Sequence, residues 1–391
     1  MDFMLYLYYS HCIFTSSTGI FYHKKDEKIM RKLSCIIICI LSVFLTSCAD
    51  NPNNIVEDIA PSILYYFEKG ENEKYQVSTM VPPVKDEKRV VLSTEDTLLK
   101  DVKKKLNYQY FRDVKEGQLR LVFFNEDLAK DEGIREIINV LYMDPAISDR
   151  LFLGIVKGDF INLLYQNELT DYFLFKEMKH NEKGGIMTVT DMHQYLKAVN
   201  SEFADPYIPY YSMEGEDLHY NGVALMKNHK IVQKLTILES SLFEILLDNK
   251  QYQDVIPLEK LQVSIGIVHN KLKLIMNESN KTVDLKIVLN GIISEYQGER
   301  DLSNVKEQKK LKKEITNEIH KQTLGLLKSF QDQNIDPLQL GLFTKRAFSQ
   351  TYHGNEWKEA WPQYNIKLKI DLNIKDYGTY QQEETEGINK G

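Results

Sequence analysis

One cysteine of this chain stands where its thiol could be chemically modified. Cys48 follows the small residues Thr46 and Ser47, an almost wholly apolar run at 33–45, and a basic pair at 31–32. The apolar run is shorter than the ~20 residues of a membrane-spanning helix, but its length and flanks suit a secretory signal peptide. This order is typical of a bacterial lipoprotein leader, in which the thiol receives a diacylglyceryl group. We therefore predict that Cys48 is the lipid attachment site, and that acyl chains hold the mature protein at a membrane.

The residues before Met30 fit a signal peptide poorly, because they include several tyrosines and a mixed-charge run at 23–28. We predict that translation starts at Met30 and that residues 1–47 are leader and signal peptide. A buried apolar segment with an incidental cysteine is the alternative, and the polar residues 50–54 that follow at once argue against it. No later apolar stretch approaches the length of a membrane span.

No other group of reactive side chains has the spacing of a catalytic motif. The sequence lacks Gly-x-Ser-x-Gly, a Gly-rich phosphate loop ending in Lys-Ser/Thr, Gly-x-Gly-x-x-Gly and His-Glu-x-x-His. Asp191 and His193 are two residues apart, so their side chains would point in different directions on one helix. The histidines after Cys48 are too scattered for a typical zinc site; they are His180, His193, His219, His229, His269, His320 and His353. We expect no enzymatic activity, no metal and no cofactor.

The composition restricts the possible partners and the source of stability. The chain has a formal net charge of −7, and the predicted leader is basic, so the mature part is more acidic still. This charge disfavours nucleic acid as a partner, because phosphate binding depends on basic side chains. Cys12, Cys35 and Cys39 all lie in the leader, which leaves the mature chain without a disulfide.

Two groups of side chains allow two interpretations each. Residues 309–313, which include four lysines, and Lys321 could face anionic lipid or an acidic partner, although a solvated helix face is the simpler interpretation. The tyrosines at 207, 210, 211 and 220 could form a binding surface or pack between domains, and the two weigh equally.

Hydrophobic periodicity predicts alternating strands and helices in the first half, which favours an α/β layer. The expected elements are a hairpin at 63–67 and 75–81, a helix over 98–106 with Thr94 near its cap, a strand at 119–124, helices at 126–130 and 134–142, and a strand at 150–156.

The second half predicts a sheet with one covered face, because its strands alternate apolar and polar residues. The expected elements are a hairpin at 221–226 and 230–235, a helix at 238–247, antiparallel strands at 261–268, 272–276 and 283–293, a long helix at 305–330 as the cover, and a strand at 366–374.

We place a boundary at the proline-containing stretch 205–209, because two prolines there should interrupt regular structure. The predicted parts are the leader 1–47, a tether at 48–54, an N-terminal α/β region at 55–204 that could hold two domains, a C-terminal α/β domain at 213–380 and a polar tail at 381–391.

The C-terminal part resembles a known family. Residues 330–341, which contain the sequence Asp-Pro-Leu-Gln-Leu-Gly, precede Lys345 and Arg346, and then residues 357–362 lead into the last strand. This order is similar to that of the Ger(x)C spore germination lipoproteins, the C subunits of germinant receptors. Residues 222–226 and 121–134 are also similar to the family. The chain departs from the family pattern after the lipid cysteine, where Ala49 and Asp50 replace Trp-Asp.

The resemblance implies three mixed α/β domains on a lipid anchor at the outer face of the spore inner membrane. It implies a non-catalytic subunit that assembles with membrane-embedded A and B subunits, with no small-molecule ligand assigned to this chain. Two other classes stay open. A solute-binding lipoprotein of an import system should show two similar lobes with parallel sheets. A lipoprotein hydrolase would need a nucleophile and a base, for which the sequence shows no candidate pair.

Overall fold

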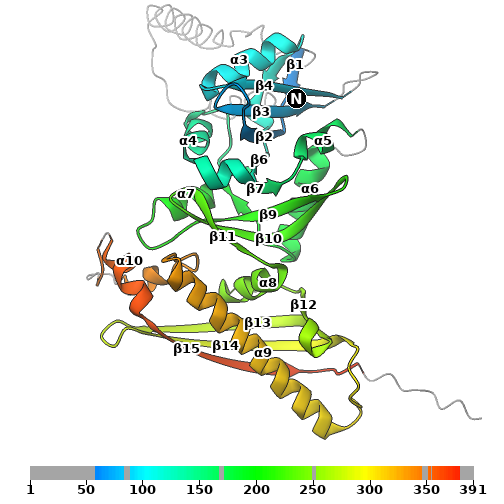
Figure 1. Ribbon diagram of the computed structural model, residues 1–391, viewed down its shortest axis with the longest axis vertical. Helices are drawn as coiled ribbons and strands as arrows, with labels where there is room; N and C mark the ends of the chain where they lie inside the picture. The colour runs from blue at the N-terminus through cyan, green and yellow to red at the C-terminus, as the bar shows by residue number, and fades with distance from the viewer. Residues whose placement is uncertain are drawn as a thin grey trace, which may run out of the picture. The chain divides into compact units, whose positions relative to one another are not determined.

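The computed structural model describes residues 58–82, 89–166, 171–248, 252–345, 351–353 and 355–378, and Figure 1 shows how their elements are arranged. The predicted leader, Cys48, the tether and the tail 381–391 lie outside the described residues. In the part that the structure describes, no helix is long and apolar enough to cross a membrane. The fold is mixed α/β, as the sequence predicts.

The first sheet has nine strands in the order β11-β10-β9-β7-β6-β2-β3-β4, with β8 beside β7. They are β2 Leu64–Lys69, β3 Tyr75–Val81, β4 Val90–Asp96, β6 Leu121–Asn125, β7 Phe152–Lys157, β8 Thr190–Asp191, β9 Tyr207–Glu214, β10 Asp217–Lys227 and β11 Lys230–Leu235. The central strands β2, β6, β7 and β9 run parallel, and the outer strands pair antiparallel. A separate parallel pair is formed by β1 Ile59–Pro61 and β5 Asp113–Lys115.

Both faces of the first sheet are covered because its central strands are apolar on both sides. Tyr65 and Phe67 belong to one buried cluster, whereas their neighbours Leu64 and Tyr66 belong to another. Helices α4 and α7 lie on one side of these strands, and α5 and α6 lie on the other (Figure 1). The helices of this part are α3 Leu99–Gln109, α4 Arg135–Met143, α5 Phe160–Tyr165, α6 Asp171–Gly184 and α7 Met192–Val199.

The second sheet has four strands in the order β12-β13-β14-β15. They are β12 Val255–Leu258, β13 Val263–Asn277, β14 Thr282–Tyr296 and β15 Asn365–Ile374. Helix α9, Val305–Asp332, crosses one face of this sheet (Figure 1) and turns a stripe of buried apolar residues towards it, among them Leu311, Ile315 and Ile319. A short helix, α10 Glu356–Ala360, precedes β15.

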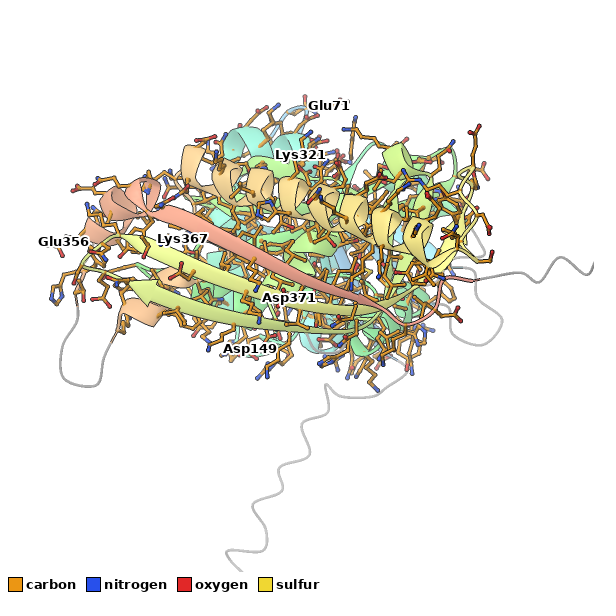
Figure 2. The ribbon with its side chains drawn as sticks, turned by 90° about the horizontal axis from the view of Figure 1, so that it is seen from below. Glu71, Asp149, Lys321, Glu356, Lys367 and Asp371 are labelled. Carbon is orange, nitrogen blue, oxygen red and sulfur yellow. The ribbon has the colours of Figure 1, made fainter. Side chains whose placement is uncertain are left out.

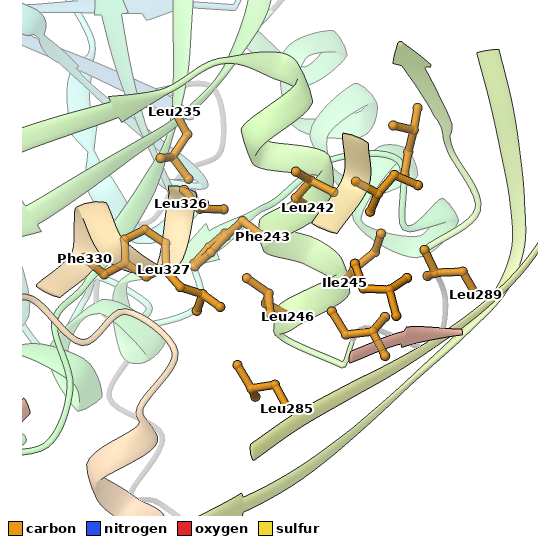
Figure 3. Packing of buried hydrophobic residues seen from close by; sticks show 14 of the residues in the cluster. Leu235, Leu242, Phe243, Ile245, Leu246, Leu285, Leu289, Leu326, Leu327 and Phe330 are labelled. Atoms are coloured by element: carbon orange, nitrogen blue, oxygen red, sulfur yellow. The ribbon is translucent and has the colours of Figure 1, made fainter. Parts of the chain in front are cut away.

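Helix α8, Ile237–Leu246, packs against elements of both sheets. Figure 3 shows Phe243 of this helix beside Leu326 and Leu327 of α9, and Leu246 nearer to Leu285. All of these residues belong to one buried cluster, which also includes Phe330 of α9. Residues 240–246 are buried all round, which is the pattern of a helix enclosed within a core. The helix begins with a capping box between Thr236 and Glu239.

The short helical turns are η2 Glu116–Gln118, η3 Leu128–Glu132, η4 Glu259–Leu261, η5 Leu340–Thr344 and η6 Trp361–Gln363. Several sequence predictions are confirmed by these elements: the hairpins β2–β3 and β10–β11, the strands β6, β7 and β15, and the helices α3, α4, α8 and α9.

Three predictions differ from the structure. Thr94 does not cap α3, because it lies in β4, a strand missing from the prediction. The stretches predicted at 261–268 and 272–276 belong to one strand, β13, which begins at Val263 and has an irregularity between Ile267 and His269. Pro209 lies inside β9, so the prolines do not interrupt the first sheet. Strands β9 to β11, which follow the first proline, therefore belong to the same sheet as the strands before it, and the division into domains at this point stays a prediction.

Candidate functional site

Asp336, in the motif that follows α9, is buried and accepts three hydrogen bonds. Its carboxylate receives the backbone N–H of Leu340 at 2.9 Å, that of Gly341 at 2.8 Å and the indole Nε1–H of Trp357 at 3.0 Å. Burial raises the pKa of Asp336 to about 7, although the three donors act in the opposite direction. The carboxyl group thus joins the turn at 340–341 to helix α10.

The same residue connects this turn to a loop in front of β9. The Asp336 N–H donates to Asp205 Oδ2 at 2.8 Å, and the Asp205 N–H donates to the Asp336 carbonyl at 3.0 Å. Burial also raises the pKa of Asp205. Gly341 is required here, because a Cβ atom at this position would lie 2.6 Å from Phe203 Cδ1 and 2.7 Å from Trp357 Nε1. These contacts show that the motif has an architectural role as a joint between these segments.

The face of the second sheet opposite α9 carries a row of lysines. Lys273 pairs in register with Lys286 of β14, which in turn pairs with Lys369 of β15. We call these three residues the lysine row. Like charges directly opposite each other destabilise a sheet, so the row has a cost in stability. The stability of the fold therefore gives no reason for three lysines to lie side by side.

Further charges on the same face only partly balance the row. Lys271 lies two residues before Lys273 on β13, and Lys367 lies two residues before Lys369 on β15. Asp371 contacts Lys286 at 2.9 Å and Lys369 at 3.7 Å, and Asp284 pairs in register with Lys367. Figure 2 shows Lys367 and Asp371 along β15. The face is therefore basic on an acidic chain, which suits contact with an anionic surface.

The lysines of α9 form a different surface from the lysine row. Lys309, Lys313 and Lys321 are exposed and alternate with the buried stripe that faces the sheet, and Figure 2 shows Lys321 on this helix. Lys310 pairs with Glu307 at 2.7 Å. This arrangement agrees with the interpretation as a solvated helix face.

The tyrosines at 207–220 pack within the protein. Tyr207 contacts Phe243 edge-on with ring centroids 5.0 Å apart, and Tyr211 contacts Tyr220 in the same way at 5.8 Å. Tyr210 is also mostly buried, and its hydroxyl donates to Glu126 at 3.0 Å. These contacts support the interpretation that the four tyrosines pack within the protein.

The structure separates Asp191 from His193. Asp191 caps α7 through the N–H of Gln194, whereas His193 contacts Asp149 at 3.1 Å. Across the described residues, no group of three or more His, Cys, Asp or Glu side chains could hold a metal ion. Cys48, the only site residue that the sequence predicts, lies outside the described residues.

Comparison with known proteins gives consistent matches over both halves of the chain. Residues 53–213 match the family model described as the spore germination protein N-terminal domain. Residues 221–378 match the model described as spore germination B3/GerAC like, C-terminal.

The similar proteins include two curated relatives and a solved structure. Spore germination protein GerQC of Bacillus cereus is 27% identical over 358 residues, which cover 88% of this chain and 98% of the relative. Spore germination protein KC of Bacillus subtilis (strain 168) is 22% identical over 333 residues, covering 76% and 78% of the two chains. The crystal structure of the GerBC protein matches with a TM-score of 0.52 and 14% identity, covering 80% of this chain and 96% of that one. This last likeness concerns the fold.

Proposed function

The chain belongs to the GerAC family of spore germination proteins, and we propose on this basis that it is the C subunit of a germinant receptor. The observation that carries the proposal is the match of two family models in order, over 53–213 and 221–378. A spore germination protein of similar length, GerQC, supports it, because the alignment covers 98% of that relative. In this role the protein is non-catalytic and acts through assembly or signalling with membrane-embedded A and B subunits.

Lipid attachment at Cys48 would place the body at the outer face of the spore inner membrane. Acylation supplies binding energy in proportion to the buried methylene groups, and more than one chain is needed for stable attachment. We expect Cys48→Ala to leave the body folded but to release it from the membrane fraction or block its processing. Membrane fractionation of spores with an antibody to the body measures this. A Cys48→Ala protein that remains membrane-bound and fully active would contradict the anchor.

The lysine row is our candidate for the contact with the partner subunits. Five lysines and two aspartates on the open face of the second sheet, Lys271, Lys273, Lys286, Lys367, Lys369, Asp284 and Asp371, favour an acidic surface on the partner. Because the row is solvent-exposed, its neutralisation should affect association more than folding.

The row can be tested with a matched control. The triple variant Lys273→Gln, Lys286→Gln and Lys369→Gln should lower the amount of protein that co-purifies with the tagged A and B subunits. The control replaces Lys309, Lys313 and Lys321 of α9 with Gln, which removes the same charge from a different surface. Equal co-purification of both triple variants with the partner subunits would refute the role of the row. Loss of binding to anionic vesicles alone would assign the row to lipid.

Deletion of the gene tests the function as a whole. Spores without this protein should fail to respond to at least one nutrient, and the wild-type gene should restore the response. Unchanged germination on every nutrient tested, including that of any neighbouring receptor genes, would refute the proposal.

A solute-binding lipoprotein fits the described residues less well. Its two lobes should be similar, whereas the nine-stranded sheet here has a parallel centre and the four-stranded sheet is mostly antiparallel. No specific observation favours that alternative.

A further inference from the structure

The outer side of helix α3 carries basic and aromatic residues in a line. Lys100, Lys104 and Tyr108 follow one another at intervals of four residues, so they lie along one side of the helix. The opposite side of the helix is buried against the core of the first sheet. Both lysines are exposed, and so is Tyr108. We call these three residues, together with Phe111 just beyond the helix, the α3 ridge.

The lysines of the α3 ridge differ from the other lysines of the same helix in their partners. Lys103 and Lys105 reach carboxylates of neighbouring segments at 3.0 and 2.9 Å. The Lys104 ammonium group lies 5.9 Å from the centre of the Tyr108 ring, and among the described residues neither lysine of the ridge has an acidic partner. Asp101 is the one acidic residue of α3. The ridge therefore keeps a positive charge on a chain whose formal net charge is −7.

The aromatic side chains of the α3 ridge are largely open to solvent. Tyr108 and Phe111 are each 76% exposed. The Phe111 ring is held from one side by Tyr110, with ring centroids 4.7 Å apart, and by the Arg112 guanidinium group at 5.0 Å. A solvated helix face gives no reason for such exposed aromatic area. Aromatic rings beside lysines are typical of surfaces that lie at the boundary between water and a bilayer.

The α3 ridge also lies where the predicted tether enters the body. Strand β1 pairs in parallel with β5, with Ile59 opposite Asp113, so the described chain begins beside the segment that carries Phe111. Figure 1 shows α3 next to β1. Ten residues lead from Cys48 to Asp58, and they span at most about 36 Å when fully extended. Acylation of Cys48 would therefore keep this end of the body close to the bilayer.

We propose that the α3 ridge lies on the anionic surface of the membrane to which the protein is anchored. Its two lysines face lipid phosphates, and its two exposed aromatic rings enter the headgroup region. Because the tether is short, this contact is intramolecular, so a few weak interactions suffice to orient the body on the bilayer. The inference deepens the proposed function and rests on its lipid anchor at Cys48.

Quenching of a tryptophan placed on the ridge tests the contact. The protein with its anchor, carrying Tyr108→Trp, is reconstituted into phosphatidylglycerol vesicles in which some lipids bear a nitroxide near the headgroup. Trp357 and Trp361 are 1% exposed and supply the background. We expect the nitroxide to quench the added fluorescence at least twofold. Tyr165→Trp is the matched control, because Tyr165 is 59% exposed at the end of α5, on the other face of the first sheet; its added fluorescence should stay unquenched.

The charges of the ridge are tested in the same protein. Lys100→Gln and Lys104→Gln together, added to Tyr108→Trp, should reduce the quenching at least twofold. Phosphatidylcholine vesicles and about 0.5 M salt should reduce it as well, because both weaken the attraction between the lysines and the lipid phosphates. The control replaces Lys309 and Lys313 of α9 with Gln, which removes the same charge from another exposed surface, and it should leave the quenching unchanged.

Co-flotation with the vesicles separates this inference from the proposed function. Protein that floats with the vesicles but shows equal quenching in Tyr108→Trp and Tyr165→Trp would overturn the membrane contact and leave the anchor and the receptor role intact. Quenching that depends neither on lipid charge nor on the two lysines would overturn the contact with lipid phosphates. Shielding of Tyr108→Trp only when the A and B subunits are added would assign the ridge to a protein partner instead. Protein that does not float would contradict the anchor and this inference together.

Discussion

Replacing Asp336 with Ala removes the acceptor at the centre of the joint behind α9. The carboxylate receives hydrogen bonds from Leu340 N, Gly341 N and Trp357 Nε1, and the side chain is buried. Alanine would leave all three donors without this acceptor in an enclosed space. The variant therefore measures how much this one side chain contributes to the stability of the C-terminal half.

The cost can be worked out from the three donors. A buried donor without an acceptor costs about 1–3 kcal/mol, and partial relaxation favours the lower part of that range, so the three together should cost about 3–6 kcal/mol. Near pH 4, close to the ordinary pKa of 3.8, the side chain is uncharged in the folded protein and only about half charged in the unfolded chain. The loss of stability measured at this pH then reports mainly hydrogen bonds and packing.

The chain has a built-in reporter for this region. It contains two tryptophans, Trp357 and Trp361, and both are 1% exposed beside the joint. Chemical denaturation followed by tryptophan fluorescence should show an earlier transition in Asp336→Ala. Asp332→Ala is the control, because Asp332 is exposed at the end of α9 and should change stability by less than about 0.5 kcal/mol. A transition in Asp336→Ala within about 1 kcal/mol of the wild type would refute the reasoning.

The pH dependence of stability gives a second test of the role of Asp336. The pKa of Asp336 is about 7 in the folded protein and near its ordinary value of 3.8 in the unfolded chain. Between these values the folded state binds more protons, so this carboxyl lowers stability as the pH rises from about 4 to 7. Asp205 and Glu68 also have raised pKa values and contribute in the same direction. Asp336→Asn should therefore reduce the slope without abolishing it, and an unchanged slope would contradict the raised pKa.

Three further substitutions follow from single contacts. Gly341→Ala should destabilise the protein by about 1–3 kcal/mol, because its Cβ would overlap Phe203 and Trp357. Denaturation by urea measures this loss, and unchanged stability would contradict the close approach of these side chains. Lys273→Glu should stabilise the protein by a few tenths of a kcal/mol, because glutamate would face Lys286 in register. The gain in stability should shrink at high salt, and a loss of stability would argue against repulsion within the lysine row. Thr236→Ala should cost about 1 kcal/mol by removing the cap of α8, whereas Thr236→Ser should restore most of it in thermal melts.

The sequence predicts individual helices and strands better than it predicts which strands pair with each other. Strand β15 and helix α9 follow directly from a strict alternation and from a helical apolar stripe. Strand β13 appears as two pieces because its alternation is lost near His269, where the pairing with β14 shifts by a residue. The parallel pairing of β14 with β15 is set by the chain between them, and periodicity carries no information about it.

The candidate sites were predictable to different degrees. The role of Asp336 cannot be predicted from a local pattern, because its partners Trp357 and Asp205 are distant in sequence. The lysine row needs the register of three strands, which no local pattern supplies.

The hairpin β10–β11 has a consequence for how this protein can be divided. The second family model begins at residue 221, within β10, yet β10 and β11 are outer strands of the sheet formed mainly by the first half. A polypeptide that stops at residue 213 would leave β9 with a bare hydrogen-bonding edge, which invites aggregation through strand addition. Recombination between paralogous genes at this boundary would have to preserve the fit of β10 to β9. A division between the two halves therefore has to keep β10 and β11 with the first half.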